Sequence, residues 1–308
     1  MMKLLTKTLL ASAIASVSMT SAYAAEPINF YGKLNVTAQS NDIAGESETT
    51  IQSNASRFGL KGTFEINSSI EAFYTIEYQV DTGNSSSSNF TARNQFVGLK
   101  GDFGAISVGR NDTMLKKSQG RVDLFNDLDG DLKNVFAGEN RLAQTATYVT
   151  PSFNNFQAGV TYAATDDNKQ EGEDGFSLAA MYGDSRLNNT PVYAAIAYDS
   201  KVAGYDIVRA TVQGKIAGLV IGGMYQQEEE LDSGVEDSGY LLSASYKIDN
   251  VTLKAQYQEN ESHGDSWSVG GDYKLAKPTK LFAFYTHNTP ESGDDNDKYF
   301  GIGLEHSF

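Results

Sequence analysis

The chain has 308 residues, no cysteine and a net charge of −15, with 39 acidic residues against 24 basic ones. Nucleic acid is therefore excluded as an expected partner, because binding it requires a basic surface. The mean hydropathy of −0.38 is typical of a soluble protein, but it does not exclude a membrane barrel, since only every second residue of a barrel strand needs to be apolar.

The first 24 residues are predicted to be a cleaved signal peptide. Lys3 and Lys7 form a basic start, residues 9–17 form an apolar stretch, and Ala22-Tyr23-Ala24 is a small-x-small cleavage site. An N-terminal membrane anchor is the alternative, but the apolar run is short of the ~20 residues that a span needs. We therefore expect an exported chain with one domain, residues 25–308.

The first segment after this alternates with a period of two residues. Within residues 28–41, Lys33 and Asn35 fall on one face and Leu34 and Val36 on the other. A period of two predicts strands, whereas helices would repeat every 3.6 residues. The same alternation recurs in residues 57–66, 70–80, 156–162, 251–258 and 266–275.

The connections between these segments indicate which kind of β-protein this is. Short connections are expected at 67–69, 101–104, 151–155, 248–250 and 276–279, and long polar ones at 41–50, 82–89, 166–174, 227–237 and 290–297. Short turns on one rim and long loops on the other are typical of an outer-membrane barrel. A soluble sandwich requires no such asymmetry.

The predicted fold class is an all-β transmembrane antiparallel β-barrel. Cleavage would leave 308 − 24 = 284 residues, and a hairpin with its turn and loop takes about 35, which gives about 16 strands. The count could differ by two, and a barrel of this size encloses an aqueous lumen. The sixteen segments are predicted to begin near residues 28, 54, 69, 90, 104, 142, 156, 175, 191, 204, 217, 238, 250, 264, 279 and 298.

The last segment, 299–308, is apolar on one face and small or polar on the other. Phe300, Ile302 and Leu304 alternate with glycines, and the segment ends on Phe308. We expect this strand to pair with the first one and close the barrel, with Phe308 as a membrane-insertion signature.

Residues 111–140 break the pattern. This stretch lacks alternation and interleaves apolar side chains with Asp123, Asp127, Asp129 and Asp131. A loop of this length in a protein with short turns is expected to have a role. We predict that it folds into the lumen and narrows the pore; the alternative is an ordinary extracellular loop.

Several motifs resemble those of the general porins of Gram-negative bacteria. They are Tyr31-Gly32-Lys33, the run from Ser56 to Gly62, the run from Arg93 to Gly104 continuing into Val108-Gly109-Arg110, Arg141 with Tyr148, and the terminal Phe308. The resemblance implies a 16-stranded, trimeric, water-filled channel of the outer membrane whose third extracellular loop folds inside.

The resemblance also implies a charged constriction. Its basic residues would be Lys33, Arg57, Arg93 and Arg141 on the barrel wall, and its acidic residues would come from Asp123, Asp127, Asp129 and Asp131. The Pro-Glu-Phe-type turn of the family's constriction loop is absent. Each base has two alternatives: it is a solvated residue of the wall, or it is the ion-pair partner of Glu65, Glu71 or Glu77. Arg110, at the base of the loop, has an alternative in a subunit contact.

The expected function is passive diffusion of ions and small hydrophilic solutes, without catalysis, cofactor or metal. The three histidines, His263, His287 and His306, lack a nucleophile elbow and metal-ligand spacing. Expected partners are two further copies of the chain, outer-membrane lipid and lipopolysaccharide, and the acidic balance favours mild cation selectivity. Two alternatives are a surface-binding or adhesion barrel and a substrate-selective porin, for which Phe282 and Phe284 would have to belong to an aromatic track.

Overall fold

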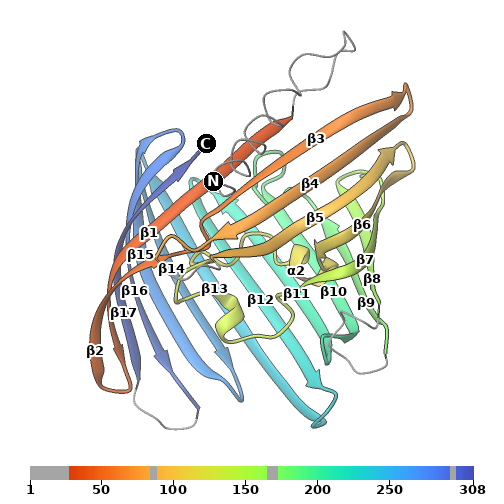
Figure 1. Cartoon of the computed structure of the whole chain (residues 1–308). Coiled ribbons are helices and arrows are strands. Elements are labelled where there is room, and N and C mark those ends of the chain that lie inside the picture. Colours follow the sequence, from red (N-terminus) through yellow and green to blue (C-terminus); the bar gives the residue numbers. More distant parts are fainter. Residues whose placement is uncertain (1–27, 84–88, 165–172, 292–295) are drawn as a thin grey trace, which may run out of the picture.

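The computed structural model describes residues 28–83, 89–164, 173–291 and 296–308. These residues form a single barrel of antiparallel strands with a segment inside it (Figure 1). Residues 1–24, the predicted signal peptide, lie outside the described part. The strands are β1 (Asn29–Ile43), β2 (Glu46–Ser53), β3 (Arg57–Asn67), β4 (Ile70–Val80), β5 (Phe90–Gly101), β6 (Gly104–Asp112), β7 (Arg141–Val149), β8 (Phe156–Ala163), β9 (Gly175–Tyr182), β10 (Val192–Val202), β11 (Tyr205–Ile216), β12 (Leu219–Glu230), β13 (Val235–Ile248), β14 (Val251–Asn260), β15 (Gly264–Ala276), β16 (Thr279–Thr289) and β17 (Asp297–Ser307).

The seventeen strands occupy sixteen positions around the barrel. β1 pairs with β3 through its first residues and with β2 through its last ones. β2 and β3 therefore form one interrupted strand. Ser56 bridges the interruption, because its hydroxyl accepts a hydrogen bond from the backbone N–H of Asn35 (2.9 Å) and donates one to the carbonyl of Asn35 (3.1 Å). The predicted count of sixteen is confirmed in this sense.

The last strand closes the barrel against the first, as predicted. β17 pairs antiparallel with β1 from Lys33↔Ser307 to Asp42↔Lys298. The backbone N–H of Phe308 donates to the carbonyl of Gly32 (3.0 Å), and the N–H of Gly32 donates back (2.9 Å). A Cβ atom on Gly32 would lie 2.3 Å from Cζ of Phe308. The terminal ring therefore lies directly over Gly32, and any side chain at this position would displace the ring.

The distribution of side chains is the reverse of that in a soluble protein. Asn35, Thr37 and Gln39 are buried inside the barrel, whereas Leu253 and Val269 on the outside are about half exposed, at 51% and 45%. Polar residues inside and a continuous apolar outer surface are what a barrel in lipid requires. Among the described residues, no helix is long and apolar enough to cross a membrane.

Two predicted long loops are wrong. β1 continues to Ile43 and turns at Ala44-Gly45 into β2, where a loop over 41–50 was predicted; β12 and β13 likewise extend through most of 227–237. Both stretches are polar on both faces, so their composition resembled that of loops although the ladder of backbone hydrogen bonds continues through them. The predicted loops at 82–89, 166–174 and 290–297 lie partly outside the described residues.

The predicted difference between the rims holds only in part. The turns at 68–69, 249–250 and 277–278 are short, but residues 183–191 between β9 and β10 lie on the same rim and form a longer connection. On the opposite rim, β10 and β11 are joined by residues 203–204 alone.

The segment between β6 and β7 lies inside the barrel (Figure 1), as predicted. It covers residues 113–140, slightly less than the predicted 111–140, because β6 runs on to Asp112. It contains the short helix α2 (Met114–Ser118) and the 3₁₀ turn η2 (Leu132–Asn134). We call it the constriction loop.

Candidate functional site: the pore constriction

Apolar side chains attach the constriction loop to the far wall of the lumen. Its buried residues pack in three clusters against strands between β9 and β16, and full burial of one such side chain contributes about 1.5–3 kcal/mol. The clusters are Val122, Leu132, Val135 and Phe136 with Met224 and Leu241; Met114 and Leu115 with Ala179, Ala197 and Ile207; and Phe125 with Phe282 and Phe284.

Polar wall residues hold the loop's backbone. Gln256 accepts a hydrogen bond from the N–H of Leu124 (2.8 Å) and donates to the carbonyl of Gly130 (2.9 Å). Gln213 accepts from the N–H of Arg121 at 2.9 Å. These glutamines replace the water that the loop's backbone groups would otherwise need, so the loop rests on the wall without a strand pairing.

A buried ion pair holds the end of the loop. The Nη1 of Arg209 on β11 lies 2.7 Å from a carboxylate oxygen of Glu139, and its Nη2 donates to the carbonyl of Ala137 (3.1 Å). Arg209 is fully buried. Removing one partner would leave an uncompensated buried charge, which is far more costly than losing an exposed pair.

The four predicted basic residues lie along one arc of the opposite wall. Lys33 on β1 and Arg57 on β3 are direct cross-strand neighbours. Arg93 lies on β5 and Arg141 at the start of β7, and the strands of this arc, from β1 through β3, β4, β5 and β6 to β7, are consecutive neighbours. The register thus gathers four bases that are far apart in the sequence.

Asp127 of the constriction loop joins this arc. Its carboxylate lies 2.9 Å from Nζ of Lys33 and forms a second ion pair with Arg57. Burial opposes ionisation of Asp127, but the charges of Arg57 and Lys33 outweigh it, so the pKa of this carboxyl is below its usual value. Asp127 is therefore a fixed negative charge against a positive wall.

Arg93 and Arg141 have partners on the wall itself. Nε of Arg93 lies 2.6 Å from Glu77, and Nε of Arg141 lies 2.9 Å from Asp112. Glu77 is one of the wall carboxylates predicted as an alternative partner of these bases, since the alternation in residues 70–80 places it on the polar face. Asp112 was missed, because it was assigned to the loop and not to the end of β6.

The other three aspartates of the loop have different environments. Asp129 accepts a hydrogen bond from Gln39 (2.7 Å), and burial raises the pKa of its carboxyl. Asp123 accepts from the backbone N–H groups of Phe125 and Leu132, and Asp131 accepts from those of Asp127 and Lys133. Asp123 and Asp131 therefore fix the loop's conformation.

A cavity of about 650 Å³ lies between the loop and the basic arc, beside the contact that Asp127 makes with this arc. Arg93 and Arg141 line it from the wall, and Asp127, Asp129 and Asp131 line it from the loop. Further charged residues around it that sequence reasoning did not select are Asp112, Lys116, Lys133 and Glu139. Lys33 and Arg57 reach this space through their pairs with Asp127, whereas Asp123 is not among the lining residues.

The chain is similar in sequence and structure to known porins. The family described as Gram-negative porin matches residues 10–303. Outer membrane porin protein 32 of Delftia acidovorans is 26% identical, over 90% of this chain and 87% of that protein.

Two solved structures share the fold. An anion-selective porin from Comamonas acidovorans superposes with a TM-score of 0.76 at 20% identity, covering 92% of this chain and all of that one. OmpT of Vibrio cholerae in a trimer form gives 0.69 at 18% identity, again over 92% of this chain and all of that one. Taken with the closed barrel and its inward loop, the family match shows that the chain belongs to the Gram-negative porins, channel proteins of the outer membrane.

Proposed function

We propose that ions and small hydrophilic solutes diffuse passively through this barrel, and that the space between the constriction loop and the arc from β1 to β7 is its narrowest section. The observation that carries this proposal is the position of Asp127, which extends from a loop inside the lumen to Lys33 and Arg57 on the opposite wall. On this proposal Lys33, Arg57, Arg93 and Arg141 form the basic side of the constriction.

Charges fixed on two facing walls set up a field across the narrow section. Water in such a field is oriented, so a solute that displaces it without replacing its hydrogen bonds and dipoles loses free energy. Small polar and zwitterionic solutes therefore pass more readily than bulky apolar ones.

We propose weak cation selectivity. Five carboxylates, of Asp112, Asp127, Asp129, Asp131 and Glu139, line the cavity with four bases, Arg93, Lys116, Lys133 and Arg141, and two further bases, Lys33 and Arg57, reach it through Asp127. The charges at the constriction therefore nearly balance, so the cation preference rests on the net charge of −15 of the whole chain. It is expected to be mild and to weaken as salt screens the charges.

The assembly is proposed to be a homotrimer surrounded by lipid and lipopolysaccharide. The resemblance of the sequence motifs to general porins supports this, and so does the similar fold of a Vibrio cholerae protein described in a trimer form. We further propose that the chain is not an enzyme.

A sugar-selective variant of this function is less well supported. Such a channel needs aromatic rings exposed along the lumen, and Phe282 and Phe284 do point inward. Both rings, however, are buried beneath Phe125 of the constriction loop, which is itself fully buried. They therefore fasten the loop and offer no free surface to a sugar.

Swelling of proteoliposomes in a series of uncharged sugars tests the proposal. A diffusion pore predicts swelling without any added ligand, at a rate that falls smoothly as the sugar becomes larger. A barrel devoted to surface binding predicts no swelling, and a substrate-selective porin predicts one sugar that enters out of order.

A further inference from the structure

A second group of charged side chains lies at the other end of the constriction loop, outside the proposed constriction. Glu228 on β12 and Asp237 on β13 are directly opposite each other in the strand register. Both are buried, with only 5% and 8% of their surface exposed. Like charges directly opposite each other across a strand pair are destabilising, and a cation bound between the two carboxylates would relieve this cost.

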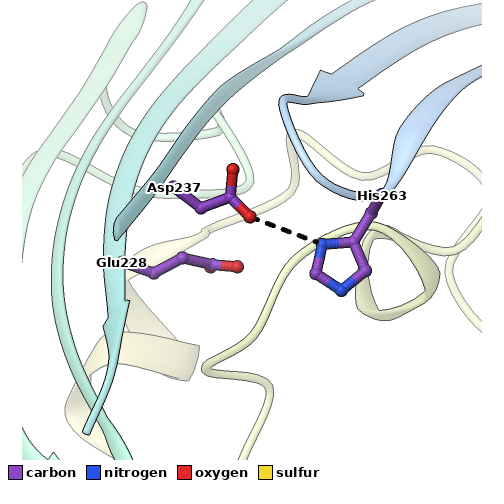
Figure 2. Close-up of side chains that lie close together, drawn as sticks. All are labelled: Glu228, Asp237 and His263. Carbon is purple, nitrogen blue, oxygen red and sulfur yellow. Dashed lines mark ion pairs between the residues drawn. The ribbon is translucent and has the colours of Figure 1, made fainter. Parts of the chain in front are cut away.

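A histidine from the neighbouring hairpin faces this pair. His263 lies in the turn between β14 and β15, and its Nδ1 is 3.9 Å from Oδ2 of Asp237 (Figure 2). One ligating atom from each of Glu228, Asp237 and His263 can be chosen so that all three lie within 4.8 Å of one another. Sequence spacing does not show this group, because the three residues come from separate strands and a turn.

Hydrogen bonds satisfy Glu228 but not Asp237. Glu228 accepts from Gln226, from the backbone N–H of Ala137 (3.2 Å) and from Asn260 (3.3 Å). Within the described residues, the buried Oδ1 of Asp237 has no hydrogen-bond partner. A buried carboxylate oxygen without a partner is costly. The other oxygen of this carboxylate, Oδ2, is directed at His263, and a cation bound between them would compensate the buried charge.

We propose that Glu228, Asp237 and His263 bind a divalent transition-metal cation, of which Zn²⁺ is the representative. Imidazole together with carboxylates suits Zn²⁺, Cu²⁺ or Ni²⁺, whereas Ca²⁺ and Mg²⁺ are held by oxygen ligands alone. Three protein ligands leave a fourth, open position for water, as in other three-ligand zinc sites.

The site must contract slightly to hold the ion. Ligand bonds of about 2.0–2.2 Å place tetrahedral ligand atoms roughly 3.3 Å apart. His263 is the residue able to move, because it is exposed and lies in a turn. Its Nδ1 is 3.1 Å from Oδ1 of Asn260, and this contact is expected to be exchanged for the metal.

The bound cation would also affect the constriction loop. Glu228 accepts the hydrogen bond of Ala137, which lies in the last part of that loop. Metal binding at this position neutralises the carboxylate pair beside the loop's attachment to the wall. The proposal does not depend on ion flow through the channel, so it can be tested separately from the proposed function.

Isothermal titration of the detergent-folded protein with ZnCl₂ tests the site. The wild type is expected to bind one Zn²⁺ per chain, and His263→Gln and Asp237→Asn are expected to weaken binding at least tenfold. His287→Gln is the matched control, since His287 lies on β16 and stacks on Trp267, and it should bind like the wild type. Lack of Zn²⁺ binding by the wild type, or an unchanged affinity in His263→Gln, would overturn the proposal.

Thermal unfolding distinguishes a metal site from a cluster whose residues only stabilise the fold. In EDTA, Asp237→Asn is expected to unfold at a higher temperature than the wild type, because the opposed carboxylates are relieved. On addition of ZnCl₂, the unfolding temperature of the wild type should rise and that of the variant should not. If CaCl₂ raised the wild-type temperature as much as ZnCl₂, and did so equally in His263→Gln, the histidine-containing site would be refuted.

Discussion

At the scale of single residues, Asp127 decides how the two sides of the constriction meet. Changing Asp127 to Asn removes one negative charge and leaves Lys33 and Arg57 without their loop partner. The cation-to-anion permeability ratio is therefore expected to fall, by about twofold or more at low salt. Reversal potential across a KCl gradient measures it. Asp232→Asn is the control, since it makes the same charge change at an exposed turn residue; an equal shift in both variants would contradict the role of Asp127.

The pKa shifts of two loop aspartates predict how selectivity responds to acid. Burial raises the pKa of Asp129, whereas the charges of Arg57 and Lys33 lower that of Asp127 despite its burial. As the pH falls from 7, Asp129 loses its charge first, above the ordinary aspartate pKa of about 3.9, and Asp127 loses its charge below that value. Cation preference should therefore decline in two steps.

The variant Asp129→Asn should lack the upper of these steps, which reversal potentials measured from pH 7 to pH 3 would reveal. Ionisation of these two carboxyls changes the free energy of unfolding in opposite directions. Asp127 stabilises the fold above its unfolded-state pKa, and this contribution is lost as the pH falls through its lower folded-state pKa. Asp129 destabilises the fold at neutral pH, and its protonation relieves this. A single step, unchanged by Asp129→Asn, would argue against the assignment.

Gly32 is the residue on which closure at the terminal ring depends. A valine there would place its Cβ within 2.3 Å of the Phe308 ring and force that ring out of place. Gly32→Val is expected to lower the temperature at which the barrel unfolds on heated SDS gels. The double variant Gly32→Val/Phe308→Ala removes the clash, so it should lose less than the two single effects added together. Strict additivity would mean that the two residues do not interact.

At the scale of elements, apolar packing attaches the constriction loop to the wall, whereas backbone hydrogen bonds between neighbouring strands hold the barrel together. Leu132 is fully buried in the cluster with Val122, Phe136 and Met224. Leu132→Ala is expected to weaken the loop's attachment by about 2–5 kcal/mol, while the strand pairings remain intact. The result should be larger and noisier single-channel currents with little change in barrel unfolding. Leu253→Ala is the control, because Leu253 faces outward. Single-channel currents of Leu132→Ala that are no larger and no noisier than those of the wild type would contradict the role of packing in holding the loop.

At the scale of the whole molecule, the alternation of side chains predicted the barrel well. The strand starts fall within three residues of those predicted, except that the second position begins earlier, with β2 at Glu46. Alternation predicts the strands because the residues that face lipid, every second one, must be apolar. Each strand can therefore be recognised from its own sequence. It failed beyond the apolar band, where β1, β2, β12 and β13 are polar on both faces and resemble loops.

The candidate site was predictable only in part. Lys33 and Arg57 could be placed inside because alternation fixes the direction of a strand residue. The roles of Asp123, Asp127, Asp129 and Asp131 could not be separated, because no period relates residues in an irregular loop. Their separation depends on contacts with distant strands, such as Asp129 with Gln39 and Asp127 with Lys33. The cluster of Glu228, Asp237 and His263 is likewise visible only once the strand register is known.

The central claim is that this barrel holds a continuous, water-filled path narrowed by charged walls. Its most direct test is the conductance of the purified protein in planar bilayers, compared between the wild type and Arg93→Ala. The expected result is stepwise openings without any ligand, in groups of three for the proposed trimer, and a cation preference that increases when Arg93 is removed. A wild-type protein that inserts but conducts no current would contradict it.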